Sequence, residues 1–114
     1  MAFNEIMANR VREIIAASTG KVAEKKMFGG LCFMVDDKIC VGVRKDTILV
    51  RLDSAVFEQA LEQEGCQPMV HGDKVMKGYV FVDKNVLTTK KQLEYWIKLA
   101  LEYNKIAKPS KKKK

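Results

Sequence analysis

The sequence contains few of the residues on which most catalytic and metal sites depend. Its 114 residues include one histidine, His71, and three cysteines, Cys32, Cys40 and Cys66. No two of these cysteines form the Cys-x-x-Cys spacing of zinc sites and redox-active pairs, so the sequence predicts neither. An odd cysteine count of this kind fits a reducing compartment, in which we expect the three thiols to be small buried apolar side chains.

Long apolar runs are also absent. No segment approaches the roughly 18 to 20 consecutive apolar residues that a membrane-spanning helix requires. The N-terminal segment carries Glu5, Arg10 and Glu13 where a secretory leader has a continuous apolar stretch. We therefore expect a cytoplasmic protein that makes no contact with a membrane.

The charge is unevenly distributed. The chain has 21 basic and 14 acidic residues, a formal charge of +7 and a pI of about 9.4. Six of the basic residues lie among the last ten residues, which contain no acid: Lys105, Lys108, Lys111, Lys112, Lys113 and Lys114. The remaining 15 basic residues nearly balance the 14 acidic ones, so the positive charge belongs to a tail and not to the body of the protein.

Hydrophobic spacing divides the first half of the chain into a helix and three strands. Phe3, Met7, Val11 and Ile14 follow a helical period, with Ile6 and Ile15 widening the apolar stripe, and Gly20 ends the helix. Three short apolar segments come next, separated by turns at 36–38 and 45–46; they are Leu31–Val35, Ile39–Val43 and Thr47–Leu52. Connections this short join only antiparallel neighbours, so residues 31–52 are predicted to form a meander.

The second half of the chain predicts a helix, two strands and a final helix. The first of these helices begins at Asp53 or Ser54 and ends near Gly65. A short strand at 69–71 and a longer one at 78–82 come next, and Thr88 or Thr89 opens the last helix. The predicted fold is α+β, in two layers with the order α-β-β-β-α-β-β-α, and its mainly antiparallel sheet carries the helices on one face. We expect one domain over residues 1–105 and a flexible lysine-rich tail over 106–114.

No group of residues predicts catalysis. His71 lies in a turn-rich stretch and is expected to be an exposed turn residue, while pairing with Cys66 as nucleophile and base is the alternative. The pair Gly29-Gly30 leads into a strand and not into a helix, which argues against a phosphate-binding loop. A turn or bulge with positive φ is the simplest reason for these glycines. We expect no enzyme activity, no cofactor and no metal site.

Three blocks of the sequence resemble the N-terminal domain of the TfoX/Sxy family. They are Glu24–Leu31, Met76–Val82 and Tyr95–Ala100, in the order and spacing of the family, and the likeness extends over roughly residues 5–105. The resemblance implies a two-layer fold of helix, three strands, helix, two strands and helix. It also implies bacterial regulation, because full-length members promote competence gene expression as co-regulators beside a cyclic-AMP-dependent activator and are not known as enzymes.

The family offers no catalytic residues to this chain. The positions that match its motifs are expected to determine the fold; they are Met27, Phe28, Gly29, Gly30, Met76, Gly78, Tyr79 and Trp96. Full-length members carry a second, C-terminal domain that resembles a helix-hairpin-helix module. This chain stops at Lys114, where that domain would begin, so we expect a stand-alone single-domain member.

Two classes of function remain after these exclusions. The first is a regulatory module that binds a protein partner such as a transcription regulator, or a second copy of itself, through an exposed sheet face or edge that includes the meander of 31–52. The second is sequence-independent nucleic-acid binding by the tail. The candidate contacts for that function are Lys108, Lys111, Lys112, Lys113 and Lys114. A solvated tail without a partner is the alternative to the second class.

Overall fold

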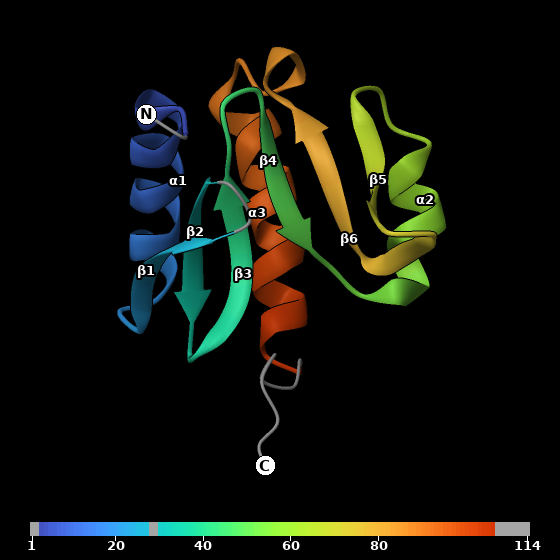
Figure 1. Cartoon of the computed structure of the whole chain (residues 1–114). Coiled ribbons are helices and arrows are strands. Elements are labelled where there is room, and N and C mark those ends of the chain that lie inside the picture. Colours follow the sequence, from blue (N-terminus) through green and yellow to red (C-terminus); the bar gives the residue numbers. More distant parts are fainter. Residues whose placement is uncertain (1–2, 28–29, 107–114) are drawn as a thin grey trace.

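A computed structural model describes residues 3–27 and 30–106 of the chain (Figure 1). Its two long helices are α1 (Glu5–Ser18) and α3 (Lys90–Asn104). Three short helices lie between them: η1 (Ser54–Val56), α2 (Phe57–Leu61) and η2 (Lys84–Val86). Its strands are β1 (Val22–Met27), β2 (Gly30–Val35), β3 (Lys38–Val43), β4 (Thr47–Arg51), β5 (Cys66–His71) and β6 (Lys74–Asp83). They form one antiparallel sheet in the order β1-β2-β3-β4-β6-β5.

The predicted α+β class and antiparallel sheet are confirmed, with one additional strand. β1 pairs along its whole length with β2, from Val22 opposite Val35 to Met27 opposite Gly30. Its middle residues, Glu24 to Lys26, are charged and exposed, as is common in an edge strand, so the segment has no apolar alternation from which a strand could be predicted. The observed order is therefore α-β-β-β-β-α-β-β-α.

All three α-helices bury side chains in one core against a single face of the sheet. Val11 of α1, Phe57 of α2 and Ile97 of α3 belong to the same buried cluster. Figure 1 shows α3 behind the central strands, with α1 at one side and α2 beside β5. Ile6 does not belong to this stripe, because it lies about 100° around the helix from Met7 and is 75% exposed.

The central strands are covered on both faces. Every residue of β2 and β3 is buried, and a second, smaller cluster of Cys32, Met34 and Ile39 lies apart from the main core, with Tyr79 packed against it. The strands of the meander of 31–52 are therefore largely buried, and only its turns are exposed, so it does not form the exposed contact face that its apolar sequence suggested.

Close packing of backbones explains Gly30. A Cβ atom at this position would lie 2.1 Å from the carbonyl oxygen of Val43 on β3, a distance that no side chain tolerates. The expectation of a positive φ is wrong for Gly30, because the described glycines with positive φ are Gly65 and Gly72. Phe28 and Gly29 lie outside the described residues.

The start of α3 agrees with the sequence, whereas the second predicted helix is shorter than expected. Thr89 caps α3 in a capping box with Gln92, as predicted, and Asn4 caps α1 by accepting a hydrogen bond from the Met7 N–H. The helix predicted from Asp53 or Ser54 to near Gly65 is instead the pair η1 and α2, which is capped by Asp53 and ends at Leu61.

Candidate functional site

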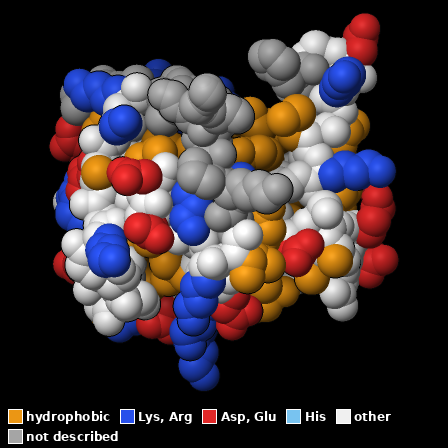
Figure 2. All heavy atoms as spheres, turned by 90° about the horizontal axis from the view of Figure 1, so that it is seen from below, with side chains coloured by type: hydrophobic (Ala, Val, Ile, Leu, Met, Phe, Trp, Pro, Cys, Tyr) orange, Lys and Arg blue, Asp and Glu red, His pale blue; other side chains and the backbone are white. Residues whose placement is uncertain are grey.

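The hairpin of β5 and β6 carries a group of exposed apolar side chains. Val70 and Val75 lie directly opposite each other near its tip and are 55% and 48% exposed. Met76, one residue further along β6, is 36% exposed. We call residues 69–77 the arm. Figure 2 shows the side of the molecule that holds β5 and β6 projecting from the body, with hydrophobic side chains in the recess between them.

The arm begins where the two strands separate. Pro68 lies opposite Val80, but the next residue, Met69, lies opposite Met76, so three residues of β6 have no partner in β5. The carbonyl of one of them, Gly78, instead accepts a hydrogen bond of 2.9 Å from the N–H of Leu52. Such an irregularity bends a strand and redirects the residues beyond it. The predicted motif residue Gly78 therefore lies at the base of the arm.

A half-buried arginine connects the base of the arm to α3. The guanidinium of Arg51 lies 5.8 Å from the ring centre of Tyr79 on β6 and 5.5 Å from that of Tyr103 on α3. Burial raises the pKa of the Tyr79 hydroxyl, and Arg51 only partly opposes this effect, so Tyr79 stays neutral and packs as an apolar ring. These cation–π contacts hold β4, β6 and α3 together below the arm.

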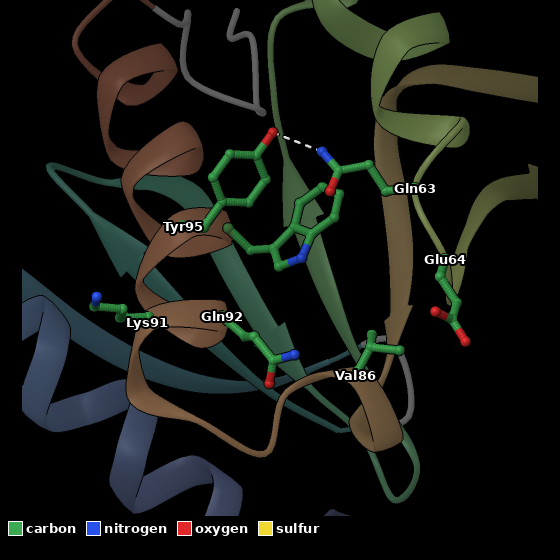
Figure 3. Close-up of a pocket in the computed structure, with 7 residues that line it drawn as sticks. Gln63, Glu64, Val86, Lys91, Gln92 and Tyr95 are labelled. Atoms are coloured by element: carbon green, nitrogen blue, oxygen red, sulfur yellow. Dashed lines mark hydrogen bonds between the residues drawn. The ribbon is translucent and has the colours of Figure 1, made fainter.

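A pocket of about 450 Å³ lies between α3 and the connection from α2 to β5 (Figure 3). The side-chain amide of Gln63 donates a 2.6 Å hydrogen bond to the hydroxyl oxygen of Tyr95 across this space. Trp96, whose ring packs edge-on against Tyr95 at 5.2 Å, and Val86 supply apolar surface. The motif residue Trp96 is thus shared between the core and this pocket.

The cysteines are unsuited to nucleophilic chemistry. Burial raises the pKa of Cys32 to about 11, that of Cys40 to about 12 and that of Cys66 to about 11. A reactive cysteine requires a lowered pKa, so these thiols stay protonated and inert near neutral pH. Their burial confirms the structural role expected of them.

His71 cannot serve Cys66 as a base. The two residues lie at opposite ends of β5, with Cys66 opposite Val82 and His71 opposite Lys74. Five steps along a strand separate their Cα atoms by about 16 Å, far beyond hydrogen-bonding distance. Within residues 3–27 and 30–106, no three His, Cys, Asp or Glu side chains come together as a metal site would require.

The remaining predicted residues have structural positions or lie outside the described chain. Asp36 and Asp37 form the turn between β2 and β3, both with positive φ, and the Asp53 side chain accepts a hydrogen bond from the Ala55 N–H. Met27 ends β1. The structure does not describe Phe28, Gly29 or the tail lysines from Lys108 onward.

Sequence reasoning missed the arm and the Gln63–Tyr95 pocket. Apolar residues in a strand are ordinarily predicted to be buried, so Val70 and Val75 gave no sign of exposure. The sequence does show a turn at Gly72-Asp73. If the strands on both sides are extended up to this turn, Val70 lies opposite Val75, as the structure has it. No pattern in the sequence relates Gln63 to Tyr95, which are 32 residues apart.

The chain matches the model of a known protein family. The family model of the TfoX N-terminal domain matches residues 13–103. No curated protein matches the chain. None of the helices in the part of the chain that the structure describes is both long and apolar enough to span a bilayer.

Proposed function

Because the chain belongs to the TfoX N-terminal domain family, we propose that it is a regulatory module that acts by binding another protein. The arm is the observation that supports this function most strongly. Exposed apolar side chains that gather in one place are characteristic of protein contact sites, whereas single ones are common on any surface. Val70 and Val75 form such a pair on one face of the arm and Met76 is exposed on the other face, while Ile6 on α1 is exposed on a different element.

The rest of the surface supports the arm as the contact. β1, at one edge of the sheet, carries the exposed charges of Glu24, Lys25 and Lys26, and β5, at the other edge, contains Pro68, which has no N–H to donate. Charges and proline both disfavour the addition of a further strand at a sheet edge. A partner therefore contacts side chains of the arm, and pairing of two copies edge to edge is disfavoured.

The chemistry of the arm indicates what its partner presents. Lys74 and Lys77 are exposed beside the apolar residues, with Asp73 the one acid of the turn. An apolar centre with a charged rim is the usual arrangement of a transient interface. The partner we propose, a transcription regulator, offers apolar side chains surrounded by acidic ones. Binding of this kind needs no catalytic group, and the role we propose is not enzymatic.

The experiment is a comparison of two surface substitutions. The full chain with Val75→Glu and the full chain with Ile6→Glu each replace one exposed apolar residue by the same acid, and both should fold because neither residue is in the core. Affinity capture from cells should lose its specific partner with Val75→Glu and keep it with Ile6→Glu. Equal capture by the two variants would refute the role of the arm.

The lysine-rich tail supports a second candidate, sequence-independent binding of nucleic acid. Lys108 and Lys111–Lys114 give the terminus a charge that the nearly neutral body lacks. Lysines on a terminal segment contact phosphates and carry no code for bases. Removal of residues 108–114 separates this function from the arm, because the arm is left intact.

A further inference from the structure

The pocket beneath the Gln63–Tyr95 hydrogen bond has the lining of a small-molecule site. Its volume of about 450 Å³ falls within the range of about 300–1,000 Å³ typical of ligand pockets. Trp96 and Val86 provide apolar surface on one side, and the Gln63 amide and Tyr95 hydroxyl join across the space. Figure 3 shows Gln63 and Tyr95 approaching each other from two different parts of the fold.

One hydrogen-bond donor of this pocket lacks an acceptor within the described chain. Trp96 is only 4% exposed and lines the pocket, yet its indole N–H donates no hydrogen bond to any residue in 3–27 or 30–106. The nitrogen itself is not enclosed by the described residues, so an acceptor in the pocket can reach it. An acceptor supplied from outside the chain would satisfy this group.

The other polar groups of the pocket are mostly donors too. The Oε1 atom of Gln92 accepts hydrogen bonds from the Thr89 N–H and the Thr88 hydroxyl, which leaves its Nε2 atom directed toward Val86 (Figure 3). The Tyr95 hydroxyl accepts from Gln63 and keeps its own proton to donate. The pocket also adjoins the first turn of α3, a positively polarised helix end.

One cation and one acid lie at the rim. Figure 3 shows the ammonium of Lys91 directed away from Gln63 and Val86, and because the side chain is exposed it can turn toward a bound anion. Glu64 is on the opposite side, exposed, with its carboxylate pointing outward. The donors of the lining thus outnumber its acceptors, which are Gln63 Oε1 and the Glu64 carboxylate, and this balance favours an anion.

We propose that this pocket binds a small carboxylate with an apolar body, whose oxygens accept hydrogen bonds from Trp96 and Gln92 while its apolar part packs against Trp96 and Val86. A carboxylate only accepts hydrogen bonds, which suits a donor-rich site, and its negative charge suits the end of α3. This site is separate from the arm, so the inference does not depend on the proposed protein contact.

The test uses benzoate as the probe and its neutral isostere benzamide as the control. Trp96 is the single tryptophan of the chain, so its indole N–H gives one resonance in a ¹⁵N-correlated NMR spectrum. Benzoate should shift this resonance downfield and saturably, while benzamide at the same concentration should shift it at most one third as far. A resonance that does not move, or that moves equally with both probes, would overturn the proposal.

Two neighbouring lysines provide matched variants. Lys91→Gln removes a charge from the rim of the pocket, whereas Lys90→Gln removes the same charge from the same turn, where Lys90 lies 4.0 Å from Glu94 and does not line this pocket. Benzoate should bind about threefold more weakly to the Lys91 variant and within about 1.5-fold of the parent to the Lys90 variant. Glu64→Gln should tighten binding about twofold. Equal effects of the two lysine variants would contradict the assigned site.

Discussion

The ammonium of Lys38 donates a hydrogen bond of 2.6 Å to the backbone carbonyl of Asn104. Lys38 begins β3 and Asn104 ends α3, and both are buried, at 8% and 5% exposure. The Asn104 side chain in turn donates to the carbonyl of Val35 on β2. A cation at the negatively polarised end of a helix is stabilising, so this pair fastens the last turn of α3 to the β2–β3 hairpin.

Loss of this contact should destabilise the fold. Lys38→Ala leaves the carbonyl of Asn104 buried without its donor, which should lower the free energy of unfolding by about 1–3 kcal/mol. The control is Lys84→Ala, which removes an exposed ion pair with Asp46 of 3.3 Å and should cost at most about 1 kcal/mol. Urea unfolding followed by circular dichroism measures both. Equal losses would show that the Lys38 contact contributes no more than a surface pair.

Two glycines should respond differently to the addition of one methyl group. Gly30→Ala places a carbon against the Val43 carbonyl and should cost about 2–4 kcal/mol, because a backbone must move. Gly20→Ala meets no atom within 4 Å and should change stability by less than about 1 kcal/mol. Thermal unfolding of the two variants tests the comparison. A Gly30 variant as stable as the Gly20 variant would mean that β2 and β3 do not pack closely at this position.

The cysteines should make stability depend on alkaline pH. Burial raises their folded-state pKa values to about 11 or 12, above those of the unfolded chain near 9. Their contribution to stability is therefore complete below about pH 8.5 and is lost as the pH rises toward 11 or 12. The contribution of the three cysteines to the free energy of unfolding should stay constant from pH 7 to 8.5. It should decrease above pH 8.5. The folded protein should react slowly with a thiol reagent at pH 8, and the protein unfolded in urea should react fast, because only unfolding exposes the thiols.

The tail makes a quantitative prediction for polyanions. Lys105 and the five tail lysines, all bound to phosphates, would give a slope of about −5 for the logarithm of affinity against the logarithm of salt concentration. Deletion of residues 108–114 leaves Lys105 and should reduce the slope to about −1. Replacement of Lys25 and Lys26 on β1 by glutamine serves as the control and should change it little. An unchanged slope after the deletion would remove the tail from nucleic-acid binding.

The sequence predicted most of the fold because its periodic apolar residues are the ones that the core buries. Val11, Phe33 and Ile97 illustrate this agreement, and Thr89 shows that a local capping pattern is equally readable. β1 was missed because its partner strand, and not its own composition, makes it a strand. Ile6 was predicted to widen the buried stripe of the first helix because it is apolar and adjoins Met7. Its position on the helix points it away from the core.

The candidate sites were much less predictable. Exposure of Val70 and Val75 depends on how far the β5–β6 hairpin extends beyond the body, which local sequence does not specify. The pocket depends on a contact between Gln63 and Tyr95 that only the packing of α3 beside the α2–β5 connection creates. Both are products of tertiary structure, whereas the family motif residues mark the fold itself.

The arm as a protein contact is most directly tested by photo-crosslinking in living cells. A photoreactive amino acid at position 75, in place of Val75, lies within the arm, and the same amino acid at position 6, in place of Ile6, lies on α1 at an exposed position. We expect position 75 to give one discrete crosslinked species containing a second protein and position 6 to give none. Crosslinks of the same pattern and yield at both positions, or none at position 75, would contradict the proposed function.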